Sequence, residues 1–186
     1  MTLHALAARP MALIGARCVG KTSVGRALAS ALGLGFVDLD DAITWAASEG
    51  CCAAHTPTVV QVVENLGWDG FRELESRELA RVLSGGERRV LSTGGGAIER
   101  ESNRRLLRER ALCIWLRQAP DVLRERLAAD KGLRPSLTGA RPKDEIAALL
   151  ERRKPLYAEC AHLALDCGTD SIERLVERIR AALDVR

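Results

Sequence analysis

The sequence predicts a single α/β domain built on a parallel sheet of five strands, and two observations carry this prediction. Short apolar runs alternate with segments of helical spacing along the 186 residues, and strands that alternate with helices pair in parallel. In addition, a glycine-rich segment joins the first apolar run to the first helical pattern. Because the chain is long enough to bury its own core and shows no repeat or linker, residues 1–186 are expected to form one domain with its core at about 11–183.

The glycine-rich segment reads Gly15-Ala16-Arg17-Cys18-Val19-Gly20-Lys21-Thr22-Ser23, which is the spacing of a P-loop. A buried strand is predicted before it at Met11–Ile14, and a helix after it at Ser23–Leu32. In a P-loop, backbone N–H groups surround the phosphates of a nucleoside triphosphate at the positive end of the helix. Lys21 then reaches the β and γ phosphates, and the Thr22 hydroxyl ligates magnesium. A glycine turn that binds nothing is the alternative.

The second strand is predicted at Phe36–Asp40, and it carries two carboxylates at its end. Ligands bind at that end of the strands in an α/β sheet. Since residues two apart on a strand share a face, Asp38 and Asp40 are both expected to point into the ligand crevice. The alternative is that an aspartate caps the helix that follows near Ala42–Ala47.

The middle of the chain contains Arg72 in the first turn of a predicted helix, where a cation is unexpected. The elements predicted there are a connection at Ser48–Pro57, a short helix at Thr58–Leu66, a turn at Gly67–Gly70 and a strong helix at Phe71–Leu83. Arg72 lies in the first turn of the strong helix, where cations are disfavoured. It is either a surface arginine paired with Glu73 or Glu75, or a ligand for an anion.

Three glycines, Gly94-Gly95-Gly96, directly follow the third strand at Arg89–Thr93. Such a triplet exposes backbone to whatever lies above the sheet, with a flexible loop as the alternative. The remaining predicted elements are a helix at Glu101–Arg110, a strand at Ala111–Leu116, a helix at about Pro120–Ala129, a helix at Lys143–Arg153 ended by Pro155, a strand at Leu163–Cys167 and a helix at Ser171–Leu183. Asp170 and Glu173 are expected to form a capping box for the last helix.

Composition and charge exclude several functional classes. The net charge is only +3, and the arginines of 100–110 are interleaved with glutamates, so no nucleic-acid partner is expected. No apolar run reaches the roughly 18 residues of a membrane span and no signal peptide is present, which favours a cytoplasmic protein without a membrane partner. The six cysteines form no C-x-x-C pair, so neither a zinc site nor a disulfide framework is expected. Cys18 lies before a helix N-terminus that favours its thiolate, so alkylating it is expected to block the nucleotide site.

The ordered set of motifs resembles shikimate kinase, and most of all the isozyme II type. The resemblance runs from about Met11 to Leu183. It rests on the P-loop and on the segments Asp38–Asp40, Gly67–Glu75, Ser92–Gly96, Leu133–Gly139 and Glu151–Tyr157. It implies a three-layer P-loop kinase fold of the nucleoside-monophosphate-kinase type, with a substrate-binding helical region at about 41–80 and a mobile lid at about 130–141. The implied reaction transfers the γ-phosphoryl group of ATP to the 3-hydroxyl of shikimate, with Mg²⁺, in a monomer.

The resemblance also implies a role for each site residue. ATP would be bound by Gly15, Cys18, Val19, Gly20, Lys21, Thr22, Ser23, Arg126 and Arg134, with Arg126 on the adenine and Arg134 swinging over the phosphates from the lid. Magnesium would be held by Thr22 and Asp38. Shikimate would be held by Asp40, Arg72, Gly95 and Arg153, the two arginines gripping its carboxylate. Lys21, Asp40 and Arg134 would be catalytic, with Asp40 either accepting the proton of the attacking hydroxyl or orienting it.

Two features depart from the family pattern. The segment between Asp40 and Arg72 is longer than usual near Cys51–Thr58, and Trp68 stands where many members have glutamate. Two other functions stay open. One is a gluconate kinase or another small-molecule kinase of the same fold, which the Asp-x-Asp, Gly-Gly-Gly and Phe-Arg motifs disfavour. The other is a regulatory nucleotide-binding module without turnover, which the complete set of catalytic residues disfavours.

Overall fold

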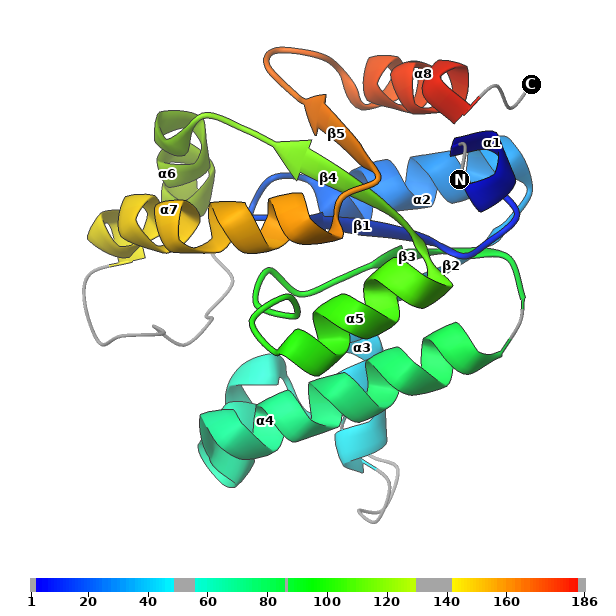
Figure 1. The fold of residues 1–186 in the computed structure, drawn as a ribbon. Coiled ribbons are helices and arrows are strands. Elements are labelled where there is room, and N and C mark those ends of the chain that lie inside the picture. The colour runs from blue at the N-terminus through cyan, green and yellow to red at the C-terminus, as the bar shows by residue number, and fades with distance from the viewer. Residues whose placement is uncertain (1–2, 49–55, 86, 130–141, 184–186) are drawn as a thin grey trace.

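The computed structural model describes residues 3–48, 56–85, 87–129 and 142–183. These residues form three layers, in which one sheet lies between two layers of helices (Figure 1). The predicted lid with Arg134 and most of the longer segment near Cys51–Thr58 lie outside the described residues.

The sheet has five parallel strands, as the sequence predicts. They are β1 (Met11–Gly15), β2 (Gly35–Asp38), β3 (Arg89–Ser92), β4 (Leu112–Arg117) and β5 (Leu163–Asp166), in the order β2-β3-β1-β4-β5. The central strand β1 is buried along its whole length. The carboxyl ends of β1, β2 and β3 therefore meet at one edge of the sheet, where the P-loop, Asp38 and the glycine triplet begin.

The helices cover both faces of the sheet. They are α1 (Leu3–Leu6), α2 (Lys21–Leu32), α3 (Leu39–Ser48), α4 (Val59–Ser84), α5 (Glu101–Arg110), α6 (Pro120–Ala129), α7 (Pro142–Cys160) and α8 (Ile172–Leu183). Helices α2 and α8 lie on one face, and α4 and α5 lie on the other (Figure 1). The sequence did not predict α1, because four residues are too few to show a helical period.

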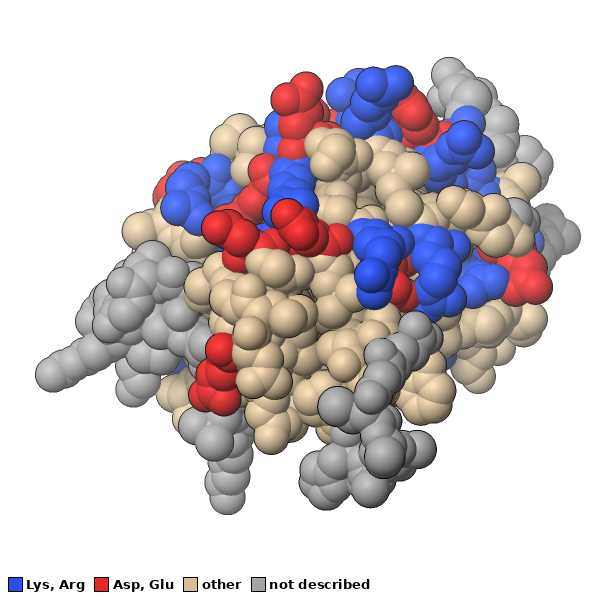
Figure 2. Space-filling view, turned by 90° about the horizontal axis from the view of Figure 1, so that it is seen from below, with Lys and Arg blue, Asp and Glu red and all other residues tan. Residues whose placement is uncertain are grey.

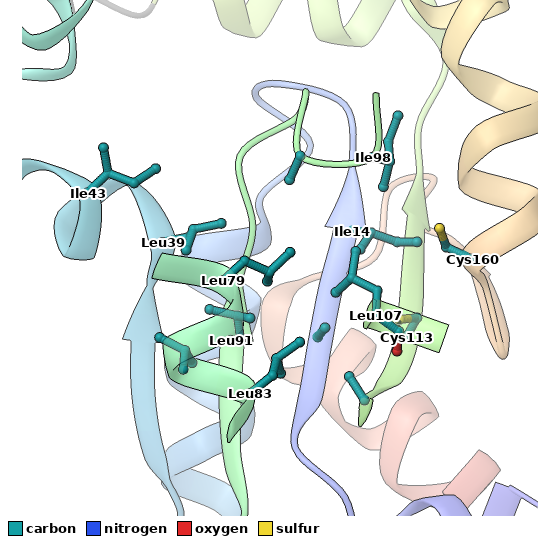
Figure 3. Close-up of a cluster of buried hydrophobic side chains, with 14 of the residues drawn as sticks. Ile14, Leu39, Ile43, Leu79, Leu83, Leu91, Ile98, Leu107, Cys113 and Cys160 are labelled. Carbon is teal, nitrogen blue, oxygen red and sulfur yellow. Dashed lines mark hydrogen bonds between the residues drawn. The ribbon is translucent and has the colours of Figure 1, made fainter. Parts of the chain in front are cut away.

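Each face of the sheet has its own apolar core. Figure 3 shows the core under α4 and α5, where Ile14 and Leu91 from the sheet meet Leu79 from α4. Cys113 of β4 is fully buried in the same cluster, and burial raises the pKa of its thiol well above the ordinary value. In this environment Cys113 packs as a small hydrophobic residue.

The sequence predicts a four-residue turn, Gly67–Gly70, between two helices. In the structure the two helices join into α4, and only Gly67 departs from helical geometry. Gly67 has a φ of 68°, a left-handed conformation that glycine adopts readily, whereas the rest of the predicted turn is helical. The first half of α4 begins with a capping box, in which Thr58 Oγ1 accepts from the backbone N–H of Gln61, and the Gln61 side chain accepts from the N–H of Thr58.

Two predicted helix ends are wrong. Helix α7 continues through Pro155 to Cys160, because Tyr157 and Cys160 are both buried and their packing outweighs the backbone hydrogen bond that proline removes. Helix α8 is capped by Ser171, whose Oγ accepts from the N–H of Arg174 at 3.3 Å. The predicted capping partner Asp170 instead accepts from Arg178 at 2.5 Å.

Charged side chains of both signs share the surface. On the face that Figure 2 shows, basic and acidic side chains alternate and do not form a stripe of one sign. Among the helices within the described ranges, none combines the length and the apolar character that crossing a bilayer needs.

Candidate functional site

A cavity of about 440 Å³ opens at the edge of the sheet where β1, β2 and β3 end. Its walls bring together three segments that the sequence predicted to bind ligands. The lining residues are Arg17, Cys18, Gly20, Lys21, Thr22, Ser23, Asp38, Asp40, Ser92, Thr93, Gly94 and Gly95. Most predicted site residues of the P-loop thus share one space with Asp38, Asp40 and Gly95, whereas Gly15 and Val19 are not part of its lining.

Glycines give the P-loop its shape. Gly15 has a φ of 143°, and a Cβ at this position would lie 2.5 Å from the carbonyl oxygen of Leu116, so no side chain fits. Gly20 has a φ of 103°, which also favours glycine. Lys21 Nζ donates to the carbonyl oxygens of Gly15 at 2.9 Å and Ala16 at 2.7 Å. These contacts hold the ammonium group against the loop at the start of α2, whose N-terminus is a site suited to anions.

Arg126 reaches the P-loop from α6. Its Nη1 lies 3.3 Å from the carbonyl oxygens of both Cys18 and Val19. Cys18 has a φ of 62°, unusual for a residue other than glycine, and it lines the cavity. The Val19 side chain is buried in the core, so this residue presents only its backbone to a ligand.

Oxygen atoms from three elements converge beside the P-loop. Thr22 Oγ1 donates to Asp38 Oδ2 at 2.8 Å and lies 3.3 Å from Ser92 Oγ. No three side chains of His, Cys, Asp or Glu within the described residues gather into a metal-binding group. Magnesium does not require one, because it usually takes one or two carboxylates together with water and substrate phosphates. The hydroxyl–carboxylate pair therefore fits a magnesium ion.

The sequence placed Asp40 wrongly at the end of a strand. Strand β2 ends at Asp38, and Asp40 lies in the first turn of α3. Asp38 Oδ1 accepts from the N–H of Asp40 at 3.0 Å, so Asp38 caps α3 as well as facing Thr22. Asp40 still lines the cavity, because α3 begins at the edge of the sheet.

The predicted anion ligands Arg72 and Arg153 lie together and share one carboxylate. Arg72 Nη2 donates to Glu99 Oε2 at 3.3 Å, while Arg153 Nε and Nη2 donate to Glu99 Oε1 at 3.1 and 3.0 Å. Arg72 also pairs with Glu75 at 2.7 Å. The two arginine side chains are only 13% and 5% exposed, so the interpretation of Arg72 as a surface arginine is wrong although its pairing with Glu75 is correct.

The glycine triplet lies between this arginine cluster and the P-loop. A Cβ on Gly96 would lie 2.2 Å from Arg72 Nη2, and a Cβ on Gly95 would lie 3.3 Å from the backbone nitrogen of Arg17. Tyr157 Oη donates to the carbonyl oxygen of Gly95 at 2.6 Å. Among the described residues, the cavity wall includes Gly94 and Gly95 but neither Arg72 nor Arg153, so the arginines lie behind the triplet.

Burial and charge shift the two carboxyl groups of the cluster in opposite directions. Burial raises the pKa of Glu75, and the Arg72 guanidinium beside it only partly offsets this. Burial also raises the pKa of Glu99, but Arg153, Arg72 and Arg152 together outweigh it, and the net pKa of Glu99 is lowered. Glu99 is therefore a carboxylate held among three cations.

Sequence reasoning missed some residues of the cluster. Glu75 was noticed only as a surface partner, although its position three residues after Arg72 on a helix predicts the contact. Tyr157 ends the Glu151–Tyr157 segment, but nothing there showed its contact with Gly95, and Glu99 had no signal because it meets Arg72 only through the fold.

A strand that runs into a P-loop, within a parallel sheet covered on both faces by helices, defines the class of P-loop kinases. The buried arginine cluster behind the cavity indicates a small anionic acceptor within that class. The family model described as shikimate kinase matches residues 17–184, and the chain belongs to the shikimate kinase family.

Individual proteins agree with this assignment. A shikimate kinase of Cereibacter sphaeroides is 40% identical over 178 residues, which cover 96% of this chain and 84% of that protein. The protein named shikimate kinase 2 of Yersinia enterocolitica is 41% identical over 169 residues, covering 90% of this chain and 91% of that protein. The structure of the Acinetobacter baumannii shikimate kinase in complex with shikimate matches with a TM-score of 0.84 and 32% identity, covering 98% of this chain and 97% of that one.

Proposed function

We propose that this chain transfers the γ-phosphoryl group of ATP to the 3-hydroxyl of shikimate, giving shikimate 3-phosphate and ADP in the biosynthesis of chorismate and the aromatic amino acids. The observation that carries the proposal is the position of Arg72 and Arg153 directly behind a glycine triplet that faces the P-loop. A small carboxylate held there would have its hydroxyls close to the phosphates. The solved relative in complex with shikimate supports this acceptor.

ATP binding falls to the P-loop. Its backbone and Ser23 face the phosphates, and Lys21 exchanges its two loop carbonyls for phosphate oxygens. Arg126 lies against the loop at Cys18 and Val19, and it would pack on the adenine. Positioning and charge stabilisation supply most of the catalysis in phosphoryl transfer, since little covalent chemistry is left to the protein.

Magnesium would be held by Thr22 and Asp38, with Ser92 beside them. When bound, the ion neutralises charge on the phosphate oxygens. Asp38 also caps α3, so one side chain fixes both the metal site and the start of the helix that carries Asp40.

Shikimate would be held at both ends. Arg72 and Arg153 bind its carboxylate, because guanidinium groups match a carboxylate with paired hydrogen bonds. Gly95 offers its backbone N–H, and Tyr157 keeps the glycine peptide in place. Asp40, which lines the cavity, orients the attacking hydroxyl or accepts its proton. Arg134 would then close over the phosphates from the lid and exclude water that competes as acceptor. A monomer in the cytoplasm completes the proposal.

The test is a coupled assay of ADP release with ATP and Mg²⁺ against shikimate, gluconate, AMP and CMP as acceptors. The proposal expects turnover with shikimate well above the rate without any acceptor. Release of ADP only with gluconate, or only with a nucleotide, would overturn the substrate assignment and leave the P-loop assignment standing. Identifying the product as a phosphate ester at the 3-hydroxyl completes the test.

A further inference from the structure

Glu99 lies at the centre of the arginine cluster. Its Oε1 accepts from Arg153 Nε and Nη2 and, at 2.8 Å, from Arg152 Nη2, while its Oε2 lies 3.3 Å from Arg72 Nη2. The second carboxylate of the cluster, Glu75, accepts a hydrogen bond from Arg72 Nη1. Both guanidinium groups that the proposed function assigns to the carboxylate of the substrate are thus already occupied by a carboxylate of the chain.

We propose that Glu99 is a positioning residue that stands in for the substrate's carboxylate in the free protein, and that its displacement from Arg72 and Arg153 sets the affinity for acid substrates. This inference rests on the proposed function, because it takes Arg72 and Arg153 to be the ligands of that carboxylate. In this inference, the substrate's carboxylate replaces the carboxylate of Glu99 on Arg72 and Arg153.

The donor geometry favours this exchange. A guanidinium offers five N–H groups in a fixed plane, and two of the three nitrogens of Arg153 already point at Glu99. Arg153 is 4% exposed, so it cannot swing out to meet a ligand elsewhere. Two carboxylates on the same donors also repel each other. An arriving carboxylate that pairs side-on with the same two nitrogens of Arg153 therefore has to displace Glu99 from them.

The surroundings of Glu99 let its carboxylate move while its backbone stays. The Glu99 side chain is 27% exposed, whereas that of Glu75 is 1% exposed. Its N–H donates to the carbonyl oxygen of Gly96 at 3.0 Å, and its own carbonyl oxygen accepts from Arg104 at 3.2 Å. On the solvent side it keeps Arg152, whose side chain is 65% exposed. A displaced Glu99 therefore retains one cationic partner.

The test compares shikimate with its uncharged methyl ester in equilibrium titrations of the nucleotide-free protein. Glu99→Gln keeps the size of the side chain and removes the competing charge. We expect it to bind shikimate roughly tenfold more tightly than the wild type and to bind the ester with unchanged affinity. The matched control is Glu109→Gln, which removes an exposed carboxylate paired with Arg105 on α5 and is expected to change neither affinity.

A thermal measurement separates competition from a purely structural role. Without ligand, Glu99→Gln is expected to melt below the wild type, because the nearly buried Arg153 loses its anionic partner. Saturating shikimate is expected to raise the melting temperature of the variant more than that of the wild type. A structural role alone would lower the melting temperature without enlarging the shift that shikimate produces.

The outcomes distinguish this inference from the proposed function. If the wild type prefers shikimate to the ester but Glu99→Gln binds shikimate no more tightly, the exchange is refuted and the proposed function stands. If neither the wild type nor Glu99→Gln prefers shikimate to the ester, no carboxylate site exists at the arginines, and the inference falls together with the role proposed for Arg72 and Arg153. Should Glu99→Gln fail to fold, Glu99→Asp serves in its place. Its side chain is shorter by one methylene group, which moves the carboxylate away from Arg153, so we expect shikimate to bind more tightly by a smaller factor. Unchanged or weaker binding by that variant would overturn the inference.

Discussion

Replacing Gly96 by alanine tests the arginine cluster from the backbone side. The added Cβ would lie 2.2 Å from Arg72 Nη2 and 2.7 Å from Arg72 Cζ. Non-bonded heavy atoms pack at about 3.5 Å, so the guanidinium has to move by roughly 1 Å. Such a shift would remove the contact proposed between Arg72 and the substrate's carboxylate, and a charge-assisted hydrogen bond is worth about 1.5–3 kcal/mol. We expect the KM for shikimate to rise about tenfold to a hundredfold, with the KM for ATP unchanged.

The assay is steady-state kinetics with each substrate varied in turn, together with circular dichroism to confirm the fold. The matched control is Gly35→Ala, because a Cβ at Gly35 meets no atom within 4 Å. That variant is expected to keep both KM values. A folded Gly96→Ala enzyme with wild-type KM for shikimate would refute the role of Arg72, and an equal rise for ATP would show that the whole loop had moved.

Three further predictions follow from the same contacts. Lys21→Ala is expected to abolish turnover while the circular dichroism spectrum is retained, and full activity would refute the P-loop assignment. Tyr157→Phe leaves the Gly95 carbonyl without its 2.6 Å donor, so we expect a loss of about 1 kcal/mol in denaturant unfolding and a higher KM for shikimate; no change in either would contradict the contact. Because the pKa of Glu99 is lowered in the folded protein, Glu99 contributes stability above the ordinary carboxyl pKa of about 4.3, and this contribution is lost as the pH falls through the lowered value. The melting temperature of Glu99→Gln is therefore expected to lie furthest below the wild type near neutral pH and to approach it in acid; a gap that widens in acid would contradict the shift.

The fold was predictable from local patterns. Each strand is an apolar run next to a helical period, and the P-loop fixes the order of strand, loop and helix. The errors occurred where packing outweighs a local rule. Pro155 is a strong signal for the end of a helix, yet the buried side chains of Tyr157 and Cys160 keep α7 continuous. Asp40 reads as part of a strand because a two-residue alternation cannot show where a helix starts.

The site was predictable where its residues lie in contiguous motifs. Thr22 and Asp38 each belong to a recognisable segment, and their 2.8 Å contact follows because β1 and β2 end at the same edge of the sheet, on either side of β3. Glu99 belongs to no such segment, and its partners Arg72 and Arg153 lie far from it along the chain. The packing of both α4 and α7 against the loop after β3 brings these three charges together.

The role proposed for Arg153 is to bind the acceptor and not the nucleotide, and the KM values of Arg153→Ala for shikimate and for ATP measure it. The control is Lys154→Ala, which removes the adjacent cation, whose side chain is 61% exposed. We expect Arg153→Ala to raise the KM for shikimate much more than that for ATP, and Lys154→Ala to change neither. Equal increases for the two substrates, in an enzyme that remains folded, would contradict the account.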